Sequence, residues 1–345
     1  MTATDDSSSE AATPEALLDL LFGDVSIPLL KLPILRAGLE LQVWAAIAAG
    51  RRTTRAIAAA AGSDPTGMRL LLDALTVMKL LGKDDTGYSL PPWAEHYLLP
   101  GRPTYLGDFV LEWLAWERHG RLANAIRAGE RPIVSDVTRP ESVQHFLPYY
   151  AVRALSPWHY LTRYEGYWQT LQVAPRPGLR VLDLACGAGI ASLALAVQCR
   201  AVRVTLQDWP AMLDLAVQAA RLLGVSEQVA LLPGDMLALE YGLDEFDVAR
   251  LGFVTYFFGT DDLEKLFRSV RTALSPGGVV VVEAPLCDEG RCEREEEVLD
   301  GPWLYAVSAG GDVYSFLDYE RLLEGAGFES VSAVNDSLVK ALRPA

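Results

Sequence analysis

The feature that most constrains this chain is an apolar run that contains an acid and leads into a glycine-rich turn. Residues 181–184 are apolar except for Asp183, which is typical of a strand covered on both faces. Gly187 and Gly189 follow, and an Ala/Leu-rich helical pattern comes after them. Glycines let the backbone bend and let a ligand approach it, and the next helix presents free amide groups there. The pattern predicts an α/β fold with a site for a nucleoside-bearing cofactor.

Acids follow two further predicted strands. Residues 202–206 form a second strand pattern, and Asp208 stands behind it, about twenty residues after the glycines, where a ribose diol would be met. Residues 229–232 form a third, followed by Asp235. A glycine-rich turn alone is also compatible with a tight turn that binds nothing. Successive acids at one sheet edge favour a cofactor site, because ligands gather at the carboxyl ends of parallel strands.

With these residues the chain resembles the class I S-adenosylmethionine-dependent methyltransferases, and among them the small-molecule O-methyltransferases with an N-terminal winged-helix dimerisation domain. Four motifs occur in the family's order: Asp183–Gly189, Asp208–Pro210, Gly234–Met236 and Leu274–Glu283. The resemblance implies a Rossmann-like, mainly parallel seven-stranded sheet preceded by a mostly helical winged-helix domain. It also implies methyl transfer from S-adenosylmethionine to a hydrophobic aromatic or polyketide-like molecule of specialised metabolism. A dinucleotide dehydrogenase fits less well, because Ala191 or Ser192 stands at its third glycine.

The resemblance also implies roles for individual residues around the cofactor. The residues implied to bind it are Asp183, Gly187, Gly189, Asp208, Trp209, Asp235 and Met236. The two glycines would clear space beside its methionine and ribose portions, and Asp208 would accept hydrogen bonds from the ribose hydroxyls. Asp235 would accept from the adenine amino group while Met236 packs on the adenine face. Asp183 would contact the cofactor's ammonium group or orient the turn, and the first role is favoured.

The family carries a histidine base after its fourth strand, and Tyr256 occupies that position here. A tyrosine with an ordinary pKa of about 10 is a poor base at neutral pH. Tyr256 is therefore expected to hold the acceptor, to act as a base if strongly perturbed, or to form an aromatic wall with Phe253 and Phe257. Tyrosine at this position also resembles bacteriochlorophyll-type C-methyltransferases. O-methylation leads, with C-methylation using Tyr256 and a non-methylating cofactor-binding relative as alternatives.

In the resembled family an aromatic connector lines one wall of the acceptor pocket. Candidate acceptor-binding residues are His145, Tyr149, Trp158, His159, Phe253, Phe257, Trp303 and Tyr305. Core packing is the alternative for most of the connector's aromatic residues. Acids in the segment 283–300 offer further groups for removing a proton, although the acidic run 293–297 is more typical of a solvated helix face.

The chain is expected to contain a disordered tail (1–12), a winged-helix dimerisation domain (13–104), a helical connector (105–170) and a cofactor-binding catalytic domain (171–345). Helices are predicted over 15–22, 31–49, 54–61 and 65–81, and a small hairpin follows them. A winged helix can also bind DNA, but the segment 65–75 offers only Arg69 for phosphates. The resemblance instead implies a homodimer.

The composition of the chain disfavours several classes of binding partner. The formal charge of −15 disfavours nucleic acid and anionic membrane. Charged residues and prolines interrupt the apolar segment 17–49, so no membrane span is expected, and the polar start is not a signal peptide. The four cysteines follow no metal-ligand spacing, which predicts reduced thiols and no metal in a cytoplasmic protein, with oxidation of Cys287 and Cys292 as a minor alternative.

Overall fold

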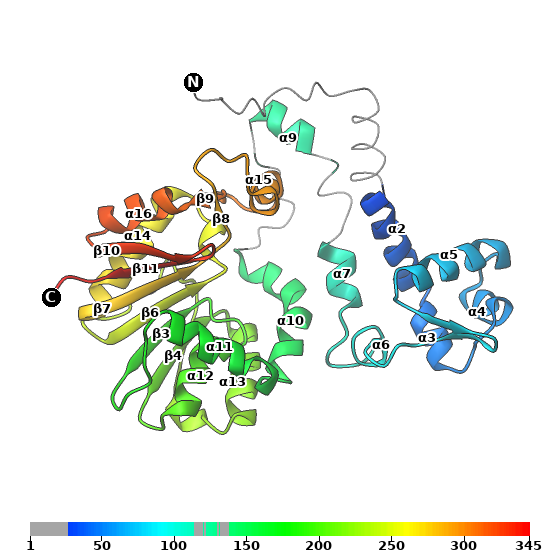
Figure 1. The fold of residues 1–345 in the computed structure, drawn as a ribbon, viewed down its shortest axis with the longest axis horizontal. Coiled ribbons are helices and arrows are strands. Elements are labelled where there is room, and N and C mark those ends of the chain that lie inside the picture. Colours follow the sequence, from blue (N-terminus) through cyan, green and yellow to red (C-terminus); the bar gives the residue numbers. More distant parts are fainter. Residues whose placement is uncertain (1–26, 114–119, 121, 130, 132–137) are drawn as a thin grey trace, which may run out of the picture. The chain divides into compact units, whose positions relative to one another are not determined.

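A computed structural model describes residues 27–113, 120, 122–129, 131 and 138–345 (Figure 1). The chain divides into two compact units, Met1–Leu114 and Ala115–Ala345, and each is described by itself. The predicted tail 1–12 and the predicted helix 15–22 lie outside the described residues.

The first unit is mostly helical and contains a small antiparallel hairpin, as predicted. Its elements are α2 (Ile27–Glu40), α3 (Val43–Ala48), α4 (Thr54–Ala61), α5 (Pro65–Val77), β1 (Gly82–Asp84), β2 (Gly87–Ser89), α6 (Ala94–Tyr97) and α7 (Gly107–Trp113). Thr53 and Asp64 cap the amino ends of α4 and α5 by accepting hydrogen bonds from backbone amides. Trp44, Ile57 and Leu72 lie in the core that these helices enclose.

Two helix predictions in this unit were too long. The segment 31–49 forms two helices instead of one, because Gln42 adopts a left-handed conformation (φ 51°) between α2 and α3. The helix predicted over 65–81 ends at Val77, and Lys79 is again left-handed (φ 61°). A residue in this region of φ cannot continue a right-handed helix, so each break is set by the backbone at one position.

The second unit is built on a seven-stranded sheet. Its strands lie in the order β10 (Glu329–Asn335), β11 (Leu338–Leu342), β7 (Leu274–Glu283), β6 (Phe246–Gly252), β3 (Arg180–Leu184), β4 (Arg203–Asp208) and β5 (Val229–Pro233). All neighbouring pairs from β7 to β5 are parallel, and β11 is antiparallel to both its neighbours. The predicted mainly parallel seven-stranded sheet is confirmed. Strand ends differ by one or two residues, since β4 runs from Arg203 to Asp208 where 202–206 was predicted.

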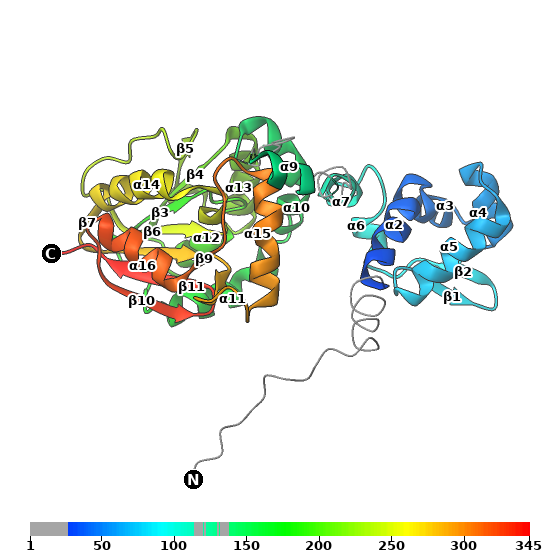
Figure 2. The ribbon, with the colours of Figure 1, turned by 90° about the horizontal axis from the view of Figure 1, so that it is seen from above.

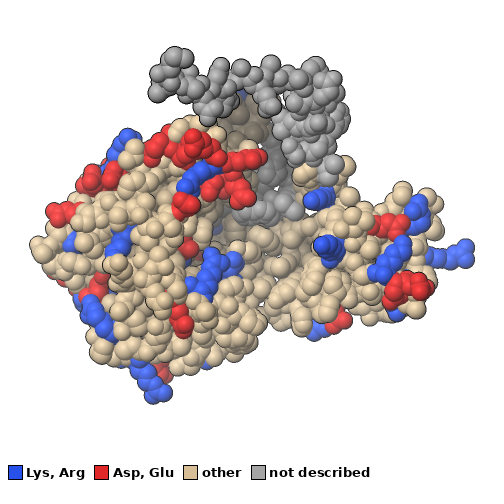
Figure 3. Space-filling model, in the orientation of Figure 1, with Lys and Arg blue, Asp and Glu red and all other residues tan. Residues whose placement is uncertain are grey.

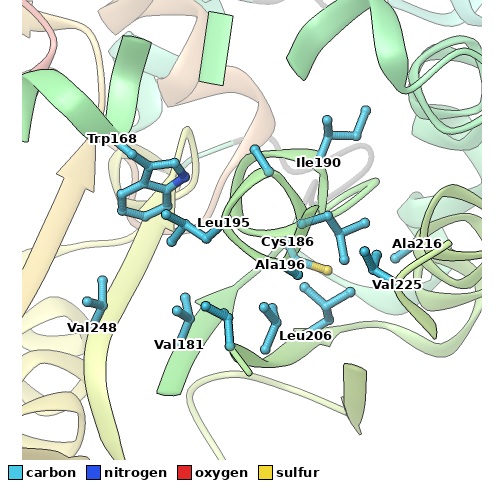
Figure 4. Packing of buried hydrophobic residues seen from close by; sticks show 14 of the residues in the cluster. Trp168, Val181, Cys186, Ile190, Leu195, Ala196, Leu206, Ala216, Val225 and Val248 are labelled. Carbon is cyan, nitrogen blue, oxygen red and sulfur yellow. The ribbon is translucent and has the colours of Figure 1, made fainter. Parts of the chain in front are cut away.

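Helices cover both faces of this sheet (Figures 1 and 2). On one face lie α11 (Trp158–Thr170), α12 (Ile190–Gln198) and α13 (Pro210–Leu222), and on the other α14 (Thr260–Ala273) and α16 (Phe316–Gly325). Successive strand residues serve opposite cores, since Val181 packs with α12 and Leu182 with α14. Figure 4 shows the first core around Val181, Leu195 and Trp168. The apolar strands are thus explained by burial on both faces.

Several smaller elements surround the carboxyl ends of the parallel strands. They are α9 (Leu122–Ala128), α10 (Pro140–Ala154), η3 (Thr255–Phe257), β8 (Leu286–Cys287), α15 (Glu295–Val307) and β9 (Tyr314–Ser315). The short turn η2 (Ser226–Gln228) instead leads into the amino end of β5. Helix α10 packs against α13, and α15 packs against α9 and β8. No helix in the described ranges is long and apolar enough to cross a membrane.

Candidate functional site

A cavity of about 750 Å³, including its open mouth, lies at the carboxyl ends of β3 to β6. Its residues come from these strand ends and the segments after them, from the first turn of α13, from α10 and Thr138 before it, and from the turn η3 with its flanks. They are Thr138, Val143, Phe146, Tyr150, Ala185, Gln207, Asp208, Trp209, Met212, Gly234, Asp235, Met236, Gly252, Phe253, Val254, Phe257 and Phe258. The position, at the carboxyl ends of parallel strands, is that of a small-molecule site in a parallel α/β sheet.

Asp208 joins the glycine-rich turn to the next strand. It is the last residue of β4 and is 9% exposed. Its carboxylate accepts hydrogen bonds from the backbone amides of Gly187 (2.9 Å) and Trp209 (2.7 Å). Burial nevertheless raises the pKa of Asp208 to about 7, because the two amides do not replace all the water that the carboxylate loses. A ligand hydroxyl in the cavity would supply a further donor to this group.

Glycine is required at the two positions of the turn for different structural reasons. A Cβ at Gly187 would overlap the ring of Tyr150, a residue of α10 that lines the cavity. At Gly189 a Cβ would instead lie 3.0 Å from Leu206, inside the sheet–helix core. Both have positive φ, 58° and 70°. Packing therefore accounts for Gly189, and only Gly187 clears space beside the cavity.

Gln207 holds two strand ends together behind the cavity. Its side chain is 2% exposed, accepts a hydrogen bond from the Ala185 amide (3.1 Å) and donates one to the Gly234 carbonyl (2.7 Å). Ala185 follows β3 and Gly234 follows β5, so one side chain of β4 fixes the turns on both sides. Buried amide groups satisfied in this way rigidify the backbone that forms the cavity floor.

Asp183 lies behind the turn, outside the set of cavity-lining residues. It is fully buried and pairs with Arg250 of β6 (3.1 Å), which also binds Glu283 of β7 (2.5 Å). The guanidinium Nε donates a third hydrogen bond to the Tyr167 hydroxyl (3.2 Å). Burial raises the pKa of Asp183 and the nearby Arg250 opposes that rise. Two carboxyl groups thus share one guanidinium behind the turn.

Among the described residues, the second carboxylate oxygen of Asp183 (Oδ2) and the hydroxyl of Ser192 have no hydrogen-bond partner. The favoured contact of Asp183 with a ligand ammonium group stays a prediction. Its pairing with Arg250 fixes the end of β3 directly before the turn, and its orienting role likewise stays a prediction.

The two residues predicted to bind adenine lie together in the structure. Asp235 and Met236 line the cavity with Trp209. One oxygen of Asp235 accepts the Leu237 amide (2.9 Å), which orients the carboxylate after β5. Met236 is buried, and the Tyr241 hydroxyl donates to its carbonyl. An acceptor carboxylate thus stands beside an apolar thioether, which suits a flat heterocycle with an exocyclic amine.

An aromatic wall faces these acids. Phe253 and Phe257 line the cavity, and Phe253 is 41% exposed and held in the left-handed region (φ 54°) by a hydrogen bond from its amide to the Glu283 carbonyl. Tyr256, the predicted catalytic residue, is not in the cavity lining. Its ring lies 4.5 Å from that of Phe257, and burial raises the pKa of its hydroxyl well above the ordinary value. Tyr256 is therefore protonated at neutral pH and can donate a hydrogen bond, which argues against its acting as the base.

Four other residues predicted to bind the acceptor do not line the cavity. On α10 the cavity is lined by Val143, Phe146 and Tyr150, while His145 and Tyr149 are not in its lining. Trp158 and His159, at the exposed start of α11, are not brought into the cavity either.

Two candidates on α15 form a layer behind the aromatic wall. Trp303 packs edge-on against Phe257 (5.9 Å between ring centroids), and Arg131 lies over the Tyr305 ring (4.8 Å).

Sequence reasoning missed Gln207, Arg250 and Tyr150 as parts of the site. Arg250 gave a signal, since a charged residue within an apolar strand is rarely buried without a partner. Gln207 and Tyr150 gave no such signal in the sequence, because their roles depend on contacts with other strands and helices.

Two family profiles match the chain: a methyltransferase domain over residues 181–278 and an O-methyltransferase dimerisation domain over residues 29–100. The tetracenomycin polyketide synthesis 8-O-methyl transferase TcmO of Streptomyces glaucescens is 25% identical over 79% of this chain and 80% of its own length. The 3-hydroxy-5-methyl-1-naphthoate 3-O-methyltransferase of Streptomyces sahachiroi is 25% identical over 95% and 94%. The crystal structure of human N-acetylserotonin methyltransferase in complex with S-adenosylmethionine aligns with a TM-score of 0.66 at 21% identity, covering 99% and 100% of the two chains.

Proposed function

Because this chain belongs to the S-adenosylmethionine-dependent O-methyltransferases that carry a dimerisation domain, we propose that it methylates a hydroxyl group of a flat, hydrophobic aromatic or polyketide-like molecule. The observation that carries the proposal is the division of one cavity into an acidic floor and an aromatic wall. The floor suits the methyl donor and the wall suits a planar acceptor.

The residues present fit S-adenosylmethionine. Asp208 offers a carboxylate to a ribose diol, and Asp235 offers one to the adenine amine beside Met236. Gly187 leaves no room for a side chain between the turn and Tyr150. When bound, S-adenosylmethionine supplies a methyl group activated for nucleophilic attack by its positively charged sulfur.

The chain's own contribution is positioning and exclusion of water. Phe146 and Tyr150 of α10 face the cavity together with Phe253 and Phe257, so an aromatic acceptor would be held between apolar surfaces. The cavity lining in the described residues contains no lysine, arginine or histidine. We infer that the acceptor has no carboxylate or phosphate at this end.

C-methylation is the second candidate, and the observation that favours it is Tyr256 in place of a histidine base. An electron-rich ring carbon needs little help from a base before it attacks a methyl group.

The first experiment is calorimetric titration of the purified protein with S-adenosylmethionine, S-adenosylhomocysteine and NAD. We expect both sulfur nucleosides to bind and NAD not to bind. Binding of NAD alone would contradict the assignment of the cavity.

The second experiment incubates the protein with S-adenosylmethionine and a panel of phenols, naphthols and polyketide aromatics. Mass spectrometry detects products whose mass has increased by the amount expected when a methyl group replaces a proton. Two-dimensional NMR then assigns the methyl group to oxygen or carbon. Oxygen methylation is expected, and a carbon-bound methyl group would establish the second candidate instead.

A further inference from the structure

Tyr150 of α10 lines the cavity and carries a hydroxyl that no described residue binds. Among the described residues, the fully buried side-chain atoms without a partner belong to Asp183 and Ser192, so the Tyr150 hydroxyl reaches accessible space. Burial raises the pKa of Tyr150, which keeps the hydroxyl protonated at neutral pH. Tyr150 therefore offers the cavity a neutral hydrogen-bond donor.

The ring of Tyr150 covers the glycine-rich turn. A Cβ built on Gly187 would lie 2.4 Å from Cε1 and 2.7 Å from Cδ1 of this ring, so the ring edge rests on the Gly187 backbone. The Gly187 amide donates to Asp208 (2.9 Å), which also lines the cavity. The Tyr149 ring meets that of Tyr150 edge-on, with 5.3 Å between the centroids. Tyr150 is thus held against the turn on the cofactor side of the cavity.

The protein itself engages three successive backbone amides of this turn. The Ala185 amide donates to the Gln207 side chain (3.1 Å), and the Cys186 amide donates to the Gln207 carbonyl (3.0 Å). The next amide, that of Gly187, is the one bound by Asp208. These amides are not available to a ligand, so an anionic ligand group beside the turn gains from a side-chain donor.

S-adenosylmethionine brings such an anionic group, because its methionine portion ends in a carboxylate. The part of the lining that the structure describes contains no lysine, arginine or histidine. Arg153 of α10 is outside this lining, lies over the Tyr149 ring (3.9 Å) and donates to the Tyr149 hydroxyl (2.5 Å). Helix α15, behind the aromatic wall, begins with acidic residues, and acidic side chains gather over it in Figure 3. A carboxylate held without a cation needs hydrogen-bond donors instead.

Other side chains of the lining also carry donors, but they are placed differently. The Gln207 amide is already bonded to a backbone carbonyl (2.7 Å), Trp209 follows β4, and Thr138 precedes α10. Tyr150 is the donor that the structure places against Gly187.

We propose that Tyr150 is a cofactor-binding residue whose hydroxyl donates a hydrogen bond to the carboxylate of the methionine portion of S-adenosylmethionine. This rests on the proposed methyltransferase function. It assigns recognition of the amino-acid end of the methyl donor to an uncharged residue of α10.

The test is calorimetric titration with two ligands that differ in this portion. S-adenosylhomocysteine carries the amino-acid group, and methylthioadenosine lacks it. Tyr150→Phe keeps the ring and removes the hydroxyl. We expect its Kd for S-adenosylhomocysteine to rise about 10- to 100-fold, the loss typical of a hydrogen bond to a charged group. Its Kd for methylthioadenosine should stay unchanged, which also shows that the variant is folded.

The matched control is Tyr164→Phe. Tyr164 of α11 is half-buried, packs edge-on against Tyr167 (5.9 Å between centroids) and is not in the cavity lining. Removal of its hydroxyl should leave both affinities at the wild-type values.

The outcomes separate this proposal from the proposed function. If Tyr150→Phe binds S-adenosylhomocysteine as tightly as the wild type does, the hydroxyl does not hold the carboxylate. A raised KM for the acceptor at unchanged S-adenosylhomocysteine affinity would assign the hydroxyl to the acceptor instead. Equal losses for both ligands would also overturn the proposal, because the defect would then lie in the shared adenosine portion. If the wild-type protein binds neither ligand, the proposed function itself fails.

Discussion

At the scale of single residues, Asp208 makes the clearest prediction. Asp208→Ala should weaken S-adenosylmethionine binding by roughly 1–3 kcal/mol at pH 8, through loss of hydrogen bonds to a buried ribose. Wild-type affinity should fall as pH drops through about 7, because the carboxylate that accepts those bonds becomes protonated. Titration calorimetry at pH 6 and 8 measures both effects. The exposed Asp214→Ala of α13 is the control, and unchanged affinity in Asp208→Ala would remove Asp208 from the site.

Ala185 adopts a strained backbone conformation in the turn. It has φ 48°, a conformation that glycine adopts freely and alanine does not. Ala185→Gly should therefore stabilise the protein by up to about 1 kcal/mol, after allowing for the greater entropy of glycine in the unfolded chain. Ala188→Gly, in the same turn but without positive φ, should destabilise it. Chemical denaturation measures both, and stability losses of equal size would show that Ala185 is unstrained.

At the scale of elements, Gln207 links the turns after β3 and β5. Gln207→Leu leaves the Ala185 amide and the Gly234 carbonyl without partners and should cost about 2–4 kcal/mol of stability. It should also weaken S-adenosylmethionine binding, because the cavity floor loses its alignment.

The matched control for Gln207 is Gln228, another buried glutamine. Its amide donates to the carbonyls of Ala196, Cys199 and Val202, away from the cavity. Gln228→Leu should lower the melting temperature similarly and leave cofactor affinity unchanged. If both variants bind S-adenosylmethionine equally well, Gln207 has no role in shaping the site.

At the scale of the whole molecule, the dimerisation-domain match leads us to expect a homodimer. Leu30 of α2 and Leu70 of α5 are each 58% exposed in the first unit, an unfavourable arrangement for apolar side chains in an isolated chain. The double variant Leu30→Glu/Leu70→Glu should shift the protein toward monomer in sedimentation velocity. Leu243→Glu, at a 66% exposed leucine of the second unit, should remain dimeric. A wild-type protein that sediments as a monomer at micromolar concentration would contradict the expectation.

The sequence by itself determined the sheet, its strand-end acids and the glycine-rich turn. These depend on local patterns: apolar runs for strands buried on both faces, and glycine or acid at fixed places after them. Asp208, Asp235 and Met236 were found in this way because the carboxyl ends of parallel strands must meet at one edge.

Only the tertiary structure decided which aromatic and polar residues join them. Trp158 and His159 are as aromatic as Phe146 and Tyr150, but the rotation of each helix against its neighbours sets which side chains reach the cavity. Arg250 meets Asp183 and Glu283 because three strands pair in one register. Such contacts join residues far apart in the chain, so the spacing of these residues in the sequence does not predict the contacts.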